Sequence, residues 1–169
     1  TRTAQRGVHL VGKDGQDLLA DGDPLLDEGG GTAHGVGAQV VGPVPAGDAL
    51  LYINGFQQGV HASNPGAEVL LTYTGSFGDT AAAAEAAQTQ IAAGADVLTG
   101  SAQQVVGAIE AIESAGGYWF GTQSNQSAQW AETVVASQVF DWTGVIKDML
   151  ENRANGVLGG IAYNLTLAN

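Results

Sequence analysis

The feature that most constrains the fold of this chain is a regular alternation of short apolar segments with longer segments of helical character from Asp48 onward. The apolar segments have the length and residue types of strands, and they lie at 68–75, 95–100, 117–122, 133–140 and 161–167. The helical segments lie at 52–63, 80–94, 105–117 and 142–155. Strands that alternate with helices of this length form βαβ units with right-handed crossovers. The alternation therefore predicts an α/β fold, a Rossmann-like three-layer sandwich with a mostly parallel sheet.

Turn and capping residues mark the ends of several predicted elements. Asn64 and Pro65 end the first helix, because proline disfavours helical backbone in the residue before it. Asp79 is placed to cap the second helix, and Gly94 is placed to close it. The strand at 68–75 contains a continuous apolar stretch, which predicts burial on both faces of the sheet.

Residues 1–47 differ in composition from the rest of the chain. They are rich in glycine and aspartate and show no sustained helical or strand period, whereas every aromatic residue lies between Tyr52 and Tyr163. We expect this segment to be poorly ordered. Two interpretations stay open: a flexible acidic leader, or a segment not native to the rest, produced by a misplaced start or a reading-frame slip. The predicted folded unit is then residues 48–169.

Charge and composition exclude several function classes. Seventeen acidic against five basic residues give a net charge of −12, which repels phosphate backbones, so nucleic acid is not an expected partner. The chain has no cysteine and no apolar run long enough for a signal peptide or a membrane span. His9, His34 and His61 fit no metal-ligand spacing, and no phosphate-loop, hydrolase or dinucleotide motif is present. We therefore expect no metal, no cofactor and no enzymatic activity.

Ligands of such sheets bind beyond the carboxyl ends of the strands, and the first suitable loop follows the strand at 68–75. Ser76 and Phe77 stand there between two glycines. The Phe77 ring is either a stacking platform for a flat ligand or a plug packed on the edge of the sheet. Asp79 is a helix cap rather than a ligand contact.

Two further loops carry neutral polar side chains. Ser101, Gln103 and Gln104 precede a predicted helix, where they either offer hydrogen bonds to a ligand or cap the helix and contact solvent. Gln123 and Asn125 follow the next strand, where their amides either bind ligand hydroxyls without adding charge or form a polar surface loop.

Phe140 and Trp142 complete the set of candidates, after the strand at 133–140. Either ring can reach the same rim, although core packing is the better interpretation for each alone. Taken together, these loops present hydroxyl, amide and aromatic groups, which suit an uncharged ligand.

The text of these loops resembles the basic membrane protein family, the ABC transporter substrate-binding proteins typified by the purine nucleoside receptor. The resemblance covers residues 48–169, and its motifs are GF-x-x-GV at 55–60, NP at 64–65, Y-x-GSF-x-D at 73–79, GADV at 94–97, VVASQVFDW at 134–142 and GG-x-x-YNL at 159–165. Members are two-lobed type I periplasmic binding proteins, tethered outside the cell membrane, that close over a nucleoside and deliver it to a permease. The resemblance implies that residues 48–169 are one lobe of such an extracytoplasmic receptor, with a nucleoside or nucleobase-like ligand and an ABC permease as partners. Residues 1–47 have no counterpart in the family's first lobe.

The resemblance also assigns roles to single positions. Phe77 matches the phenylalanine that stacks on the base, whereas Gln123 stands where nucleoside-binding members have an aspartate for the ribose hydroxyls. Asn125 replaces a second acid, Phe140 falls where those members often have a lysine, and Gln103 begins a pair that replaces two glycines. The loss of acid and base together implies a neutral, aromatic or heteroaromatic ligand. The predicted contacts are Ser76, Phe77, Gln103, Gln123, Asn125 and Phe140.

Three alternatives stay open beside the transport receptor. A ligand-sensing regulator or signalling receptor can use the same fold, and the segment upstream in the natural protein would distinguish it. An enzyme on a Rossmann-like sheet is disfavoured, because the strand ends carry no acid and base pair. The third alternative is an inert fragment.

Overall fold

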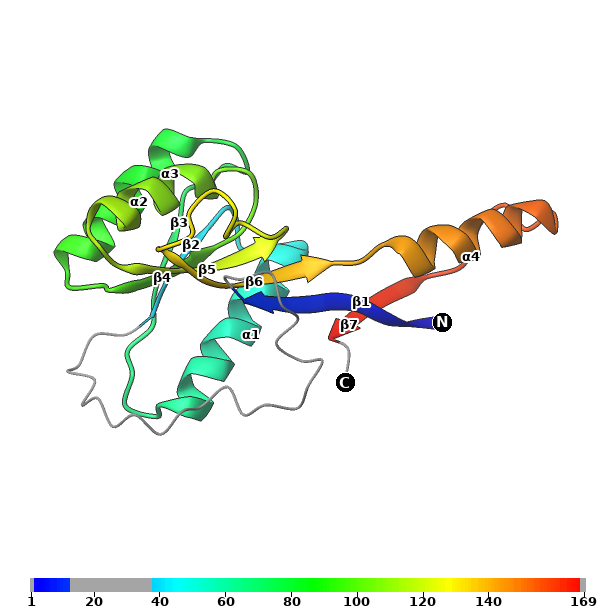
Figure 1. Cartoon of the computed structure of the whole chain (residues 1–169), viewed down its shortest axis with the longest axis horizontal. Coiled ribbons are helices and arrows are strands. Elements are labelled where there is room, and N and C mark those ends of the chain that lie inside the picture. The colour runs from blue at the N-terminus through cyan, green and yellow to red at the C-terminus, as the bar shows by residue number, and fades with distance from the viewer. Residues whose placement is uncertain (1, 13–37, 168–169) are drawn as a thin grey trace.

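A computed structural model describes residues 2–12 and 38–167, and these form an α/β fold with seven strands and four helices (Figure 1). In chain order the elements are β1 (Arg2–Gly12), β2 (Gln39–Gly42), α1 (Gly47–Ser63), β3 (Leu70–Tyr73), α2 (Thr80–Ala92), β4 (Val97–Gly100), α3 (Val105–Ser114), β5 (Tyr118–Gln123), β6 (Val134–Phe140), α4 (Thr143–Ala154) and β7 (Tyr163–Leu167). Every helix and strand predicted after Asp48 is present.

The sheet is mostly parallel, as predicted. Its strands follow the order β3-β2-β4-β5-β6-β1-β7, and the first five are parallel to their neighbours. β1 pairs antiparallel with β6, and β7 pairs parallel with β1 at the far edge. The chain leaves β2 through α1 toward β3 on one side, then returns through α2 to β4 on the other side. Such a reversal of strand order creates the crevice in which open α/β sheets bind ligands.

Two strands lie within the segment that composition assigned to a poorly ordered leader. β2 occupies a central position between β3 and β4, and the side chains of Val40 and Val41 are fully buried. β1 pairs with Ala136–Phe140 of β6. Residues 39–42, which lie before the expected boundary at residue 47, thus belong to the same sheet as the strands that follow it. The part of the leader at 13–37 lies outside the described residues.

The expectation that β3 is buried on both faces is wrong. β3 is the edge strand of the sheet and pairs only with β2. None of its residues is fully buried, and Leu70 is 38% exposed. A run of apolar residues indicates a buried strand only where helices and neighbouring strands cover both faces.

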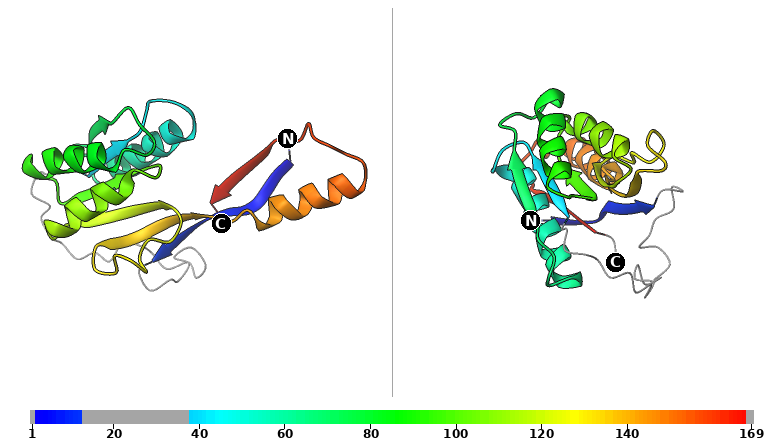
Figure 2. Two further views of the ribbon diagram at one scale, coloured as in Figure 1. Left: turned by 90° about the horizontal axis from the view of Figure 1, so that it is seen from above. Right: turned by 90° about the vertical axis from the view of Figure 1, so that its left-hand side faces the viewer.

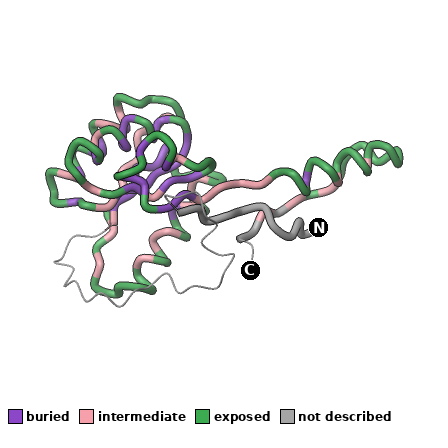
Figure 3. Tube along the Cα trace, in the orientation of Figure 1, coloured by how far each residue is buried: buried purple, intermediate pink, exposed green. Residues whose placement is uncertain are grey.

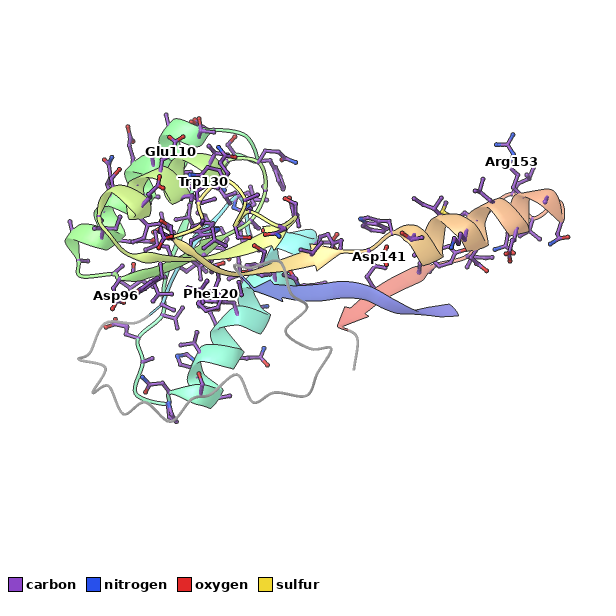
Figure 4. All side chains as sticks on the ribbon, viewed as in Figure 1. Asp96, Glu110, Phe120, Trp130, Asp141 and Arg153 are labelled. Carbon is purple, nitrogen blue, oxygen red and sulfur yellow. The ribbon has the colours of Figure 1, made fainter. Side chains whose placement is uncertain are left out.

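The main core lies between the sheet and the helix pair α2 and α3. Figure 3 shows that the buried residues gather in the sheet and in the helix faces turned toward it. Leu98 and Trp119 contribute from the strands, Ile109 and Ile112 from α3, and α2 presents alanines. Trp130 joins this cluster, on the α2 and α3 side of the sheet in Figure 4.

The α2 and α3 helices approach each other closely at one glycine. A Cβ atom at Gly107 would lie 2.0 Å from the carbonyl oxygen of Thr80, the first residue of α2. The beginning of α2 and the first turn of α3 are therefore in direct contact, and only glycine fits at residue 107.

The opposite face of the sheet is covered by α1, which lies below the sheet in Figure 1. Ile53 is buried there, and the ring of Phe56 lies 6.0 Å from that of Phe120 and 6.3 Å from that of Tyr52. The Thr99 hydroxyl donates to the carbonyl oxygen of Phe120, so the Tyr52 hydroxyl donates to Thr99. Burial is the main cause that raises the pKa of Tyr52 to about 12.

The α4 helix extends away from this layered core, as Figure 1 and the left view of Figure 2 both show. Val145 is its only buried residue, and Ile146, Met149 and Leu150 are all more than half exposed. Among the described residues, no helix combines the length and apolar character that crossing a bilayer requires.

Candidate ligand-binding site

The predicted contacts lie at the last residue of a parallel strand or in the loop that follows one, at the carboxyl edge of the sheet. Hydrogen bonds join these loops in sequence across the edge. Thr74 N donates to Gly42 O at 3.0 Å, and Gly75 N donates to Pro43 O at 2.8 Å. The Thr122 hydroxyl donates to Gly100 O at 3.2 Å, which joins the ends of β4 and β5. The edge is therefore a connected surface that passes over the point where the strand order reverses.

The β3–α2 loop presents Phe77 to solvent. The ring of Phe77 is 54% exposed, so it does not act as a buried plug. The Ser76 hydroxyl oxygen accepts from the N–H groups of Gly78 and Asp79, both at 3.2 Å. Asp79 Oδ1 in turn accepts from Ala82 N at 3.0 Å, which confirms the predicted cap of α2. Ser76 and Asp79 thus order the backbone around an exposed ring.

The β4–α3 loop separates its two glutamines. Gln103 is exposed, whereas Gln104 is fully buried and bonds to Thr74 through its side-chain Oε1. Ser101 does not cap α3: its hydroxyl is buried and finds no partner among the described residues. Ala102, which lies between Ser101 and Gln103, has a φ of 72°, in the left-handed region that non-glycine residues seldom adopt.

The end of β5 holds Gln123 in a strained turn. Its φ is 71°, and Ser124 N donates to Thr122 O at 2.8 Å across it, which is the hydrogen bond of a γ-turn. The exposed side chain of Gln123 leaves the sheet at this turn. Non-glycine residues in this conformation are held by their surroundings and gather at functional sites.

Asn125 is exposed, but half of its amide is already engaged. Its Oδ1 accepts from the backbone N–H of Ser127 at 3.0 Å and from the Ser127 hydroxyl at 2.6 Å. The –NH₂ group of Asn125 is the part directed to other partners, so this residue offers donors rather than an acceptor.

Phe140 closes the other end of the edge. Val139 is the register partner of Gln123, so the next residue, Phe140, stands just beyond the Gln123 turn. Its ring packs edge-on against Trp142 at 6.1 Å, and Trp142 is 51% exposed. The intervening Asp141, labelled in Figure 4, accepts from Thr143 N at 2.8 Å.

The structure thus places all six predicted contacts at one edge, in two groups. Ser76, Phe77 and Gln103 belong to loops that Gln104 joins. Gln123 and Phe140 end β5 and β6, and Asn125 follows β5. Asp79 and Asp141 are the acids nearest in sequence to Phe77 and Phe140, and both accept backbone hydrogen bonds. Within the described ranges no cluster of three metal-ligating side chains occurs. The edge can therefore offer an aromatic face with neutral hydrogen bonds.

Sequence reasoning missed the role of Thr74 in this arrangement. Its hydroxyl contacts Gln104 Oε1 at 2.5 Å and accepts from Ser76 N at 3.2 Å. The available signal was a hydroxyl residue at the end of a strand, directly before the glycine of the loop.

Comparisons with known proteins agree with this architecture. The family model described as Bmp, ABC transporter substrate-binding protein PnrA-like, matches residues 35–168. No curated protein matches the chain. Because the family match begins at residue 35, it includes β2 as well as the segment from Asp48 onward.

Several solved structures share the fold. An ABC transporter solute-binding protein from Aeropyrum pernix has a TM-score of 0.68 and 22% identity, over 79% of this chain and 39% of its own. One from Conexibacter woesei has a TM-score of 0.59 and 24% identity, over 77% and 42%. GanP, a glucose-galactose binding protein from Geobacillus stearothermophilus, has a TM-score of 0.58 and 17% identity, over 78% and 51%. The chain thus spans about half or less of the length of these proteins.

Proposed function

Because the chain belongs to the Bmp family of PnrA-like ABC transporter substrate-binding proteins, we propose that it captures a nucleoside or purine-like small molecule outside the cell membrane. The family is a ligand-binding component of transport systems and not a class of enzymes. The ligand class, the import role and the tether to the membrane go beyond that membership and are parts of the proposal.

The observation that carries the proposal is the exposure of Phe77 at the carboxyl edge. An aromatic ring that is 54% exposed is available to stack on a flat ligand, and its backbone is ordered by Ser76 and Asp79. Stacking of a base on such a ring contributes about 1 to 3 kcal/mol and does not depend on the sugar. A preformed platform also reduces the entropy that binding would otherwise cost.

The polar groups at the carboxyl edge support an uncharged ligand. Ser76, Gln103, Gln123 and Asn125 supply hydroxyl and amide groups, and the neighbouring acids Asp79 and Asp141 are engaged by backbone N–H groups. Purines carry several neutral donors and acceptors on one flat ring system, which matches amide groups beside an aromatic face.

A loaded receptor of this kind would deliver its ligand to an ABC permease. Proteins of this family act outside the cytoplasm, and the matched part of this chain covers 39% to 51% of the solved relatives. The chain supplies one wall of a cleft, so the affinity of the chain alone should be weak. Tight binding would then need closure over both faces of the ligand.

A nuclear magnetic resonance titration tests this proposal because it detects weak binding at a known place. We expect adenine, hypoxanthine, adenosine and inosine to shift the backbone amide signals of residues 74–79, and ribose alone to leave them unchanged. Shifts caused by ribose and by none of the purines would overturn the ligand class.

Two matched variants sharpen the test. Phe77→Ala should weaken every purine ligand by about 1 to 3 kcal/mol. Tyr118 is equally exposed, at 53%, but it begins β5 at the opposite edge of the sheet. Tyr118→Ala should therefore leave every dissociation constant unchanged, and equal losses in the two variants would show that Phe77 is not the platform.

A further inference from the structure

We propose that Gln104 is a positioning residue, a buried amide that holds the loop bearing Phe77 against the start of α3 and so fixes the stacking ring over the edge. This inference rests on the proposed function for its ligand, but its structural part stands on contacts within the chain. Gln104 is distinct from the neighbouring Gln103, which is exposed and faces solvent.

Two hydrogen bonds join Gln104 to the β3–α2 loop. Its backbone N–H donates to the carbonyl oxygen of Phe77 at 3.0 Å. Its side-chain Oε1 lies 2.5 Å from the Thr74 hydroxyl, whose oxygen also accepts from Ser76 N at 3.2 Å. The side chain of Gln104 thus acts on the loop three residues before the ring, and its backbone acts on the ring residue itself.

The Thr74 hydroxyl has one proton, and this decides how the network is completed. In the arrangement described, that proton points to Gln104 Oε1, and the buried Gln104 Nε2 has no partner. If the amide is rotated by a half-turn, Nε2 donates to Thr74, and the Thr74 proton reaches Ser76 O at 3.0 Å. Both arrangements keep the bond between Gln104 and Thr74, so the link to the loop does not depend on the amide orientation.

The β3–α2 loop is bonded to the end of β2 on one side, and Gln104 bonds it on the other side. Thr74 and Gly75 are bonded to the end of β2 through Gly42 and Pro43. Gly75 has a φ of 78°, and the half-exposed Phe77 ring gains little from packing. Gln104 supplies the anchor on the β4 side, so the loop is held across the point where the strand order reverses.

The chain contains a matched control for Gln104, namely a second buried glutamine that bonds to a threonine. Gln90 is buried, and its Nε2 donates to Thr72 Oγ1 and to Val40 O, both at 3.1 Å. Gln90 and Gln104 are therefore both buried glutamines, and each bonds to a threonine hydroxyl, Gln90 to Thr72 and Gln104 to Thr74. Gln90 lies near the end of α2, and its side chain donates to Val40 and Thr72, outside residues 74–79.

Hydrogen exchange at residues 74–79 is the test, since it reports loop opening without any ligand. We expect Gln104→Leu to accelerate exchange there roughly three- to tenfold, the factor expected from one lost hydrogen bond. Gln90→Leu should lower the thermal midpoint to a similar extent and leave the exchange at 74–79 unchanged. Equal acceleration in both variants would mean that Gln104 acts only through global stability, and would overturn the inference.

Variants of the partner residue separate positioning from packing. Thr74→Val should accelerate exchange at least as much as Gln104→Leu, because it also removes the acceptor of the Ser76 N–H. Thr74→Ser, which keeps the hydroxyl, should retain wild-type exchange. The double variant of Thr74→Val and Gln104→Leu should accelerate exchange no more than Thr74→Val alone, because that single variant already removes the bond to Gln104. Additive effects would contradict the link.

Ligand titrations of the same variants keep this inference separate from the proposed function. If the wild-type chain binds no purine but Gln104→Leu loosens residues 74–79, the proposed ligand is wrong and the loop anchor stands. If purines bind and Gln104→Leu changes neither their affinity nor the exchange, the anchor is wrong and the proposed function stands.

Discussion

The indole N–H of Trp119 donates to Oε1 of Gln126 at 2.9 Å. This bond turns the Gln126 side chain toward the core, away from the edge where its neighbours Gln123 and Asn125 are exposed. A Cβ atom at Gly121 would lie 2.5 Å from the same Oε1, so the strand makes room for the amide. Gln126 is therefore a structural residue beside the exposed amides of Gln123 and Asn125.

Replacing Gln126 should lower stability without changing the ligand edge. Gln126→Ala leaves the indole N–H of the fully buried Trp119 unpaired, which costs about 1 to 3 kcal/mol of the free energy of unfolding. Urea unfolding followed by tryptophan fluorescence measures this loss. A variant as stable as the wild type would show that water or another group replaces the amide.

Deleting the central strand β2 should abolish cooperative unfolding. A chain that begins at Asp48 lacks β2, so β3 loses its only neighbour and β4 loses one of two. A chain that begins at residue 38 keeps β2 and the five parallel strands, and it should still unfold cooperatively. Circular dichroism melts of both chains check this; midpoints within about 5 °C of each other would contradict a structural role for β2.

Gln123→Asp should shift ligand preference toward nucleosides. A carboxylate accepts from two vicinal hydroxyls by charge-assisted bonds, which contribute about 1.5 to 3 kcal/mol, more than a neutral amide contributes. The measurement is a pair of dissociation constants, base and nucleoside, with Gln123→Asn as the uncharged control. A change by the same factor for both ligands would place Gln123 away from the sugar.

Stability should fall with rising pH in a window set by Tyr52. Its pKa is about 12 in the folded chain, above the ordinary value of 10.0. The unfolded chain therefore loses this proton first, so the contribution is fully present below about pH 10 and is lost as the pH rises toward 12. Tyr52→Phe should flatten the dependence of the urea midpoint on pH between these values. A slope equal to that of the wild type would contradict the assignment.

Most helices and strands could be predicted because each is long enough to show its own period. The α2 helix has a cap at Asp79, an alanine-rich body and Gly94 after its end, and the structure confirms all three. β2 could not be predicted, since the four residues Gln39–Gly42 show neither alternation nor a long apolar run. Its burial comes from β3 and β4, which are distant in sequence.

The location of the candidate site could be predicted from the sequence, but the hydrogen bonds that hold its loops could not. Loops after parallel strands share one edge, so the sequence predicts which segments meet there. It does not predict that Gln104 points inward while Gln103 points outward. Ala102, directly before the two glutamines, has left-handed backbone, and no residue type in this segment signals such a turn.

The contact between Gly107 and Thr80 has a consequence for how this edge can diversify. Any side chain at residue 107 would push apart two helices whose leading ends carry the Phe77 loop and the Gln104 turn. The backbone spacing of the two loops is thus fixed by a glycine outside the site. Exchange of exposed side chains such as Gln103 and Gln123 would change the chemistry of this edge and leave the backbone spacing of the two loops unaltered.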